Sequence, residues 1–156
     1  MATEGKNLSD FNPDDLPDLN GKKFGIVVSE WNHNITGNLL KGALQGFRDA
    51  GVQDSDITIK YVPGTFELAL GALKLLQDSA LDGAVCLGSV IRGETAHFDF
   101  VCQAAAKGIM DVNLKSGKPV AFGVLTDDNE QQALDRSGGC HGNKGTEAAV
   151  VVMKMM

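Results

Sequence analysis

Short apolar runs alternate with segments of helical periodicity along most of the chain. Continuous runs rich in β-branched residues predict buried strands at 24–29, 57–62, 83–91 and 119–126. Between them, apolar residues recur every three to four positions, which predicts helices. These segments lie at 39–50, 66–77, 96–115 and 130–134, with a last helix from about residue 146. The stretches 31–37 and 136–145 are expected to be loops.

Several strand segments, above all 83–91, read as near-continuous apolar runs. Strands that are apolar throughout are typical of a parallel sheet covered by helices on both faces. The predicted fold class is therefore α/β, a three-layer α/β/α sandwich around a four-stranded parallel sheet.

The first 21 residues have a different character from the remainder. They are polar, carry two prolines and include an acidic run at 14–18. We interpret residues 1–21 as an N-terminal arm without its own core, which Phe11, Leu16 and Leu19 could anchor elsewhere. Residues 22–156 then form one domain. The beginning of the chain has neither the basic nor the apolar region of a secretory signal.

Composition excludes several classes of protein. A net charge of −6 argues against general nucleic-acid binding. No apolar run approaches the roughly 20 residues that span a bilayer, so no membrane segment is expected. The three cysteines form no CxxC pair, and we expect free thiols in a reducing cytoplasm. Cys140 and His141 are adjacent without a second ligand pair at suitable spacing, so no metal site is expected.

Unusual residues concentrate in the loops after the strands, in WNHNIT, VPGTFE, SVIRGETAH and the segment after VLT. Ligands of open parallel sheets bind at the carboxyl ends of the strands. The clustering therefore predicts a ligand site there without any family knowledge.

The turn GSVIRGETAH combines two features of an anion site. The amides of Glu94, Thr95 and Ala96 would be free donors at the positive end of a helix. His97 in the first turn could take up and return a proton. The alternative is that Thr95 only caps the helix and His97 is a surface residue.

The segment DRSGGCHGNKG offers Arg136 and Lys144 as cations for a phosphate. The alternative is a flexible glycine-rich linker with solvated charges. Trp31, the only tryptophan, could stack on a planar heterocycle or be a core or interface residue. Neither a Walker motif nor GxGxxG after the first strand is present, so nucleotide binding has little support.

Four blocks, SEWNHNIT, VPGTFE, GSVIRGETAHFDFVC and LDRSGGCHGNKGTEAA, resemble the signature blocks of the 6,7-dimethyl-8-ribityllumazine synthase family over residues 22–156. The resemblance implies a flavodoxin-like strand order and a transferase-class enzyme. It would condense 5-amino-6-(D-ribitylamino)uracil with 3,4-dihydroxy-2-butanone 4-phosphate, in the penultimate step of riboflavin biosynthesis. No metal or organic cofactor is implied.

The resemblance also assigns roles to individual residues. It implies that His97 transfers protons and that Asp135 supports it. Residues implied to hold the pyrimidine are Trp31, Thr65, Phe66, Glu67, Ser89, Val90, Ile91 and Phe122. Residues implied to hold the butanone phosphate are Glu94, Thr95, Arg136 and Lys144. Phe122 and Arg136 would come from a neighbouring subunit.

The resemblance implies self-association with the active site at a subunit interface. The loop after Arg136 has no insertion, which in this family accompanies pentamers closed into an icosahedral shell. The arm would add a strand to a neighbour's sheet, and riboflavin synthase is a further candidate partner. Family members often carry a lysine at the position of Cys140, so this loop lacks one positive charge.

Three alternative functions would make different demands on these residues. A non-catalytic flavin- or lumazine-binding protein would keep Trp31 but has no need of His97 and Arg136. A receiver-type signalling domain would need acidic residues where this chain has SEW and RGET, and is rejected. A purely structural shell protein differs from the enzyme only in the absence of activity.

Overall fold

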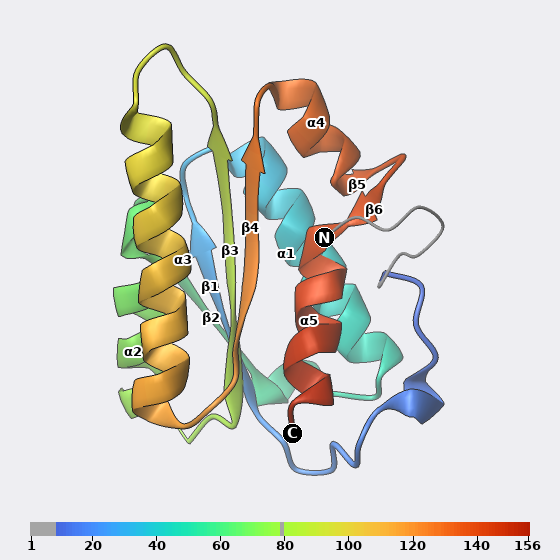
Figure 1. Ribbon diagram of the computed structural model, residues 1–156. Coiled ribbons are helices and arrows are strands. Elements are labelled where there is room, and N and C mark those ends of the chain that lie inside the picture. Colours follow the sequence, from blue (N-terminus) through green and yellow to red (C-terminus); the bar gives the residue numbers. More distant parts are fainter. Residues whose placement is uncertain (1–8, 79) are drawn as a thin grey trace.

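A computed structural model describes residues 9–78 and 80–156 (Figure 1). Four parallel strands form one sheet in the order β2-β1-β3-β4. The strands are β1 Phe24–Ser29, β2 Ile57–Val62, β3 Gly83–Ile91 and β4 Val120–Asp127. The α-helices are α1 His33–Asp49, α2 Leu68–Asp78, α3 His97–Ser116, α4 Glu130–Asp135 and α5 Lys144–Lys154. Short 3-10 turns are η1 Pro13–Asp15, η2 Asp54–Asp56 and η3 Thr65–Glu67.

Helices cover both faces of this sheet. Figure 1 shows α2 and α3 on one side and α1 and α5 on the other. Alternate residues of β1 enter the two cores: Phe24, Ile26 and Val28 pack towards α1 and α5, and Val27 packs towards α2 and α3. The expected three-layer α/β/α sandwich and the strand order are confirmed.

The four predicted strands agree with the structure to within one residue, but two predicted loops are wrong. Residues 33–37 belong to α1, because Asn32 adopts a left-handed conformation (φ 56°) and lets the helix begin at once. The stretch 136–145 contains an antiparallel hairpin of β5 Ser137–Gly139 and β6 Gly142–Asn143, and α5 follows directly at Lys144.

The described part of the N-terminal arm packs on its own chain. Phe11, Leu16 and Leu19 contact the core between the sheet and α1 and α5. The Ser9 hydroxyl donates to the Asn143 carbonyl oxygen at 3.1 Å and accepts from the Asn143 amide at 3.0 Å. No strand forms between residues 9 and 21, and residues 1–8 lie outside the described part. Donation of a strand to a neighbouring subunit stays a prediction.

Helices α1 and α5 approach each other closely. A Cβ atom at Gly145 would overlap the carbonyl oxygen of Leu39. The contact also brings hydrogen bonds: Thr146 Oγ1 donates to the Gly42 carbonyl oxygen, and Asn143 Nδ2 donates to that of Asn38, each at 2.9 Å. The contact fixes the hairpin that precedes α5. Among the described residues, no helix is both long and apolar enough to cross a membrane.

Candidate active site

A cavity of about 670 Å³ lies where β1 and β3 end and where η3 and α3 begin. This is the edge at which parallel sheets bind ligands, and the volume is that of a small-molecule site. Fourteen residues line it: Trp31, Asn32, Gly64, Thr65, Phe66, Glu67, Ser89, Val90, Ile91, Gly93, Thr95, His97, Phe98 and Val101. The structure thus brings together nine residues proposed from the sequence, from three separate loops.

Trp31 and Phe66 give the cavity two open aromatic surfaces. Trp31 follows β1, and its amide donates to the Pro63 carbonyl oxygen at 3.2 Å, which fixes the loop beside the end of β2. The side chains of Trp31 and Phe66 are 72% and 61% exposed. A core role for Trp31 is therefore excluded, and its ring is free to stack on a planar ligand or on another subunit.

Sequence reasoning missed the neighbouring residue, Asn32. Its left-handed backbone turns the chain from β1 into α1. Its side-chain amide donates to the Ser89 carbonyl oxygen at 3.1 Å and so ties the loop after β1 to the end of β3. The available signal was its residue type, because asparagine tolerates the left-handed region better than most residues.

Two buried hydroxyl groups of the lining have no hydrogen-bond partner within the described chain, those of Thr65 and Ser89. Buried polar groups are normally paired, so such groups call for a further partner. Gly88 lets Thr65 approach β3 closely, since a Cβ there would lie 2.7 Å from Thr65 Oγ1. A ligand with hydroxyl or amide groups would satisfy both.

The turn before α3 presents backbone donors. No hydrogen bond within the described residues occupies the amides of Gly93, Glu94, Thr95 or Ala96. Ala96, not Thr95, is the cap residue of α3, although Thr95 Oγ1 accepts a long 3.4 Å hydrogen bond from the His97 amide. His97 begins α3, is exposed and lines the cavity. The geometry places an unpaired helix amino end, the kind of group to which anions bind in proteins, beside an exposed imidazole.

Cationic side chains are absent from the described residues that line this cavity. Arg92, in the same turn, bonds Asp128 at 2.9 Å and Asp99 at 3.3 Å, and its guanidinium lies 4.0 Å above the Phe98 ring centre. Its charge is therefore already paired. The lining contains only Glu67 and His97 as potential metal ligands, and no three-residue ligand group forms among the described residues there.

Five residues proposed from the sequence lie outside the lining: Glu94, Phe122, Asp135, Arg136 and Lys144. Glu94 is exposed in the turn before α3. Phe122 is 37% exposed on β4, an edge strand, and Asp135 ends α4.

Arg136 and Lys144 share one buried carboxylate. Glu147 accepts ion pairs from Arg136 at 2.9 Å and Lys144 at 3.0 Å, and Arg136 also donates to the His141 carbonyl oxygen at 2.6 Å. The glycine-rich segment is therefore an ordered hairpin and not a flexible linker. Arg136 and Lys144 carry two positive charges against the single negative charge of Glu147, so these three side chains together have a net positive charge.

Asp127 is a second polar residue that the sequence did not reveal. It ends β4, and its Oδ2 atom is buried without a hydrogen-bond partner among the described residues. Burial raises the pKa of this carboxyl group; the charge of Arg136 opposes the shift and that of Asp128 adds to it. No sequence motif distinguishes it from the adjacent, exposed Asp128.

Comparison with known proteins gives a consistent result. The family model for 6,7-dimethyl-8-ribityllumazine synthase matches residues 21–156. Proteins of that name are similar over the whole chain. The one from Cytophaga hutchinsonii is 51% identical over 156 residues, covering 100% of this chain and 98% of its own.

Two further relatives show the same pattern. The protein from Flavobacterium johnsoniae is 52% identical over 155 residues, covering 99% of this chain and 82% of its own. The one from Parabacteroides distasonis is 47% identical and covers 100% of this chain and 98% of its own. With a matching family model and relatives near half identity along its length, the chain belongs to the 6,7-dimethyl-8-ribityllumazine synthase family.

Proposed function

We propose that this chain condenses 5-amino-6-(D-ribitylamino)uracil with 3,4-dihydroxy-2-butanone 4-phosphate to form 6,7-dimethyl-8-ribityllumazine, phosphate and water in riboflavin biosynthesis. One observation carries the proposal. A single cavity contains exposed aromatic faces, two unpaired hydroxyl groups, the open amino end of α3 and His97. These are the groups that a planar polyol-bearing ring and a sugar phosphate would need.

The pyrimidine is assigned to the half of the cavity nearest β1 and β3. Its ring would stack on Trp31, with Val90 and Ile91 against its edge and Phe66 and Glu67 near the ribityl chain. The hydroxyls of Thr65 and Ser89 would then pair with polar groups of the substrate. Their burial supports this role, because a buried hydroxyl without a partner carries a free-energy cost of about 1–3 kcal/mol that a ligand removes.

The butanone phosphate is assigned to the turn before α3. The free amides of residues 93–96 would bind its phosphate at the positive end of the helix dipole, with Thr95 beside them. Backbone dipoles alone compensate poorly for a dianion. Since the described lining has no lysine or arginine, Arg136 of a neighbouring subunit would supply the charge, with its Lys144 close by.

The mechanism then depends mainly on positioning. The ring amine attacks the ketone and loses water to form a Schiff base, phosphate leaves by elimination, and the second amine adds to the remaining carbonyl and loses a second water to close the ring. Holding two reactive molecules in register supplies much of the rate. His97 would carry protons between these steps, and Asp135 of the neighbouring subunit would orient it. The steps require no redox change.

Self-association follows from the incomplete site and from the exposed apolar surface. Large apolar side chains gather on β2, η3, α2 and α3: Ile59, Tyr61, Phe66, Leu70, Phe100, Met110 and Leu114 are each at least 40% exposed. Exposed apolar area of this kind marks association surfaces. Strand β2 is also an unprotected sheet edge. We assign this face to contacts within a pentamer, and further contacts to an icosahedral shell.

Location and partners complete the proposal. The cysteines form no disulfide bond within the described chain, as expected of a protein in the reducing cytoplasm. Riboflavin synthase would be the protein that consumes the product.

The decisive experiment mixes the purified protein with both substrates and follows lumazine absorbance. Enzymatic turnover above the uncatalysed rate supports the proposal. Tight binding of the pyrimidine without faster product formation would instead identify a binding protein, and an assembled particle without turnover would identify a structural shell.

A further inference from the structure

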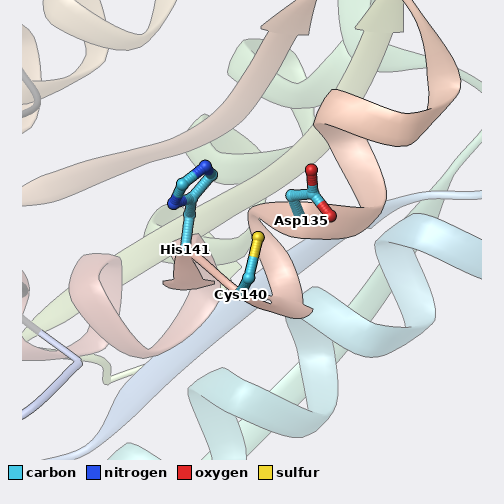
Figure 2. A group of neighbouring side chains, drawn as sticks. All are labelled: Asp135, Cys140 and His141. Atoms are coloured by element: carbon cyan, nitrogen blue, oxygen red, sulfur yellow. The ribbon is translucent and has the colours of Figure 1, made fainter.

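The β5–β6 hairpin brings together three metal-ligating side chains that lie outside the cavity. One ligand atom from each of Asp135, Cys140 and His141 lies within 4.8 Å of the others. Figure 2 shows Asp135 at the end of α4 and the other two on the hairpin, with all three side chains directed to the same side. They are the only such group of three among the residues that the structure describes.

The hairpin backbone fixes this arrangement. The His141 amide donates to the Asp135 carbonyl oxygen at 2.9 Å, which returns the chain to the end of α4. Gly138 and Gly142 adopt positive φ angles of 114° and 78°. A Cβ at Gly139 would lie 2.7 Å from Asp135 Cα, so only glycine fits there. The sequence hid the third ligand because nothing in it predicts that the chain folds back.

We propose that Asp135, Cys140 and His141 bind one divalent metal ion of the zinc class. A thiolate, an imidazole and a carboxylate are the three ligand types that zinc takes in proteins. A thiolate disfavours magnesium and calcium, which prefer oxygen ligands. Three protein ligands leave a fourth position for water or another small ligand, as in open zinc sites.

The distances require only a small adjustment. Tetrahedral zinc with bonds of about 2.0–2.3 Å places its ligand atoms about 3.4–3.8 Å apart. The ligand atoms, which lie within 4.8 Å of one another, must therefore approach each other by about 1.4 Å at most. Cys140 and His141 are exposed, so their side chains can rotate without disturbing the core. The nearby charges of Arg136 and Lys144 are directed to Glu147, not to the three ligands.

The site can be tested separately from the proposed reaction. None of the three residues lines the cavity of its own chain, and Cys140 and His141 have no role in the proposed reaction; Asp135 alone would serve both, since it would also orient His97 of a neighbouring subunit. Metal binding can therefore fail while the enzyme assay succeeds, and the reverse also holds.

A titration with Co²⁺ tests the proposal in the full-length protein. Wild type should bind one equivalent per chain with a thiolate-to-cobalt charge-transfer band, and Zn²⁺ should displace it. The Cys140→Ser variant should lose the band. His141→Ala and Asp135→Asn should each weaken Zn²⁺ binding by at least about tenfold in a competition assay, since altering only the supporting shell of a metal site already costs that much.

Matched controls identify the ligands. Cys102→Ser, His33→Ala and Asp14→Asn change the same residue types away from the hairpin and should bind Co²⁺ as wild type does. Circular dichroism checks that each variant is folded. Wild-type protein without a charge-transfer band, a band that survives in folded Cys140→Ser, or Zn²⁺ affinity unchanged in folded His141→Ala or Asp135→Asn would overturn the proposal.

Discussion

The residues of the cavity are defined as much by missing partners as by contacts. Thr65, Ser89 and the amides before α3 are polar groups that the described chain does not satisfy. The sequence revealed Trp31, Thr65, Ser89 and His97 because each lies in a loop at the end of a predicted strand. Asp127 was missed because its role depends on burial, which residue type does not encode, and Asn32 because its residue type permits a left-handed backbone without requiring one.

Replacement of His97 by alanine should lower kcat by about 10²–10⁴-fold, as expected for loss of proton transfer. A low residual activity should remain, because substrate positioning is unaffected, and it is the baseline for the co-expression experiment below. Steady-state kinetics with both substrates measures the change, with His33→Ala as the control. A kcat within a factor of two of wild type would refute the assigned role.

Replacement of Arg136 by alanine should raise KM for the butanone phosphate much more than KM for the pyrimidine. Loss of a charge-assisted contact of about 1.5–3 kcal/mol corresponds to roughly a 10–150-fold weaker interaction. Arg48→Ala, which removes an exposed ion pair with Asp54, is the control. Equal losses for the two substrates would contradict the phosphate assignment.

Asp127 predicts a pH-dependent stability difference. Because burial raises its pKa in the folded state above the unfolded value of 3.8, ionisation destabilises the fold. This cost in folding free energy is absent at a pH below the unfolded-state pKa and develops as the pH rises through the folded-state pKa. Asp127→Asn should therefore melt at a higher temperature than wild type at neutral pH.

The difference in Tm between Asp127→Asn and wild type should shrink as the pH falls below about 4. Thermal denaturation across this range measures it, and Asp14→Asn, at an exposed position, should show no such trend. A wild type that is the more stable protein at neutral pH would show that the carboxylate has a partner in the assembled protein.

Among the elements, the strands were the most predictable and the loops the least. Apolar runs locate β1, β3 and β4 to within one residue because both faces of these strands are largely buried, whereas the β-branched residues of β2 locate it although it is a mostly exposed edge. The hairpin of β5 and β6 has neither apolar periodicity nor β-branched residues. Its shape depends instead on glycines with positive φ angles. The start of α1 was missed because the left-handed Asn32 shortens the turn after β1 to three residues, 30–32.

Close packing of α1 and α5 makes Gly145 a sensitive position. Gly145→Ala would push a methyl group into the Leu39 carbonyl and should lower the free energy of unfolding by about 1–3 kcal/mol. Chemical denaturation measures this. Gly37→Ala, in α1 with open space around its Cα, should instead stabilise by roughly 0.5–1 kcal/mol. Equal stability of the two variants would contradict the described contact.

At the scale of the whole molecule, the proposed reaction needs two subunits for each site. Co-expression of His97→Ala with Arg136→Ala should therefore restore activity that neither variant has alone. With random assembly, half of the chains supply an intact His97 and half an intact Arg136, so about a quarter of the sites carry both.

Size-exclusion chromatography with light scattering would verify that the co-expressed variants form one mixed particle. Activity equal to the average of the two separate variants in such a particle would place His97 and Arg136 in the same subunit. The arrangement across a boundary would then be wrong.

The attachment of Ser9 to Asn143 has a practical consequence for anyone who modifies this protein. Because Ser9 is hydrogen-bonded to the hairpin that follows Arg136, changes at this point of the arm act directly on that segment. Truncation past residue 9 would release one support of the hairpin. Fusion designs should therefore be checked for sugar-phosphate affinity, and not only for yield.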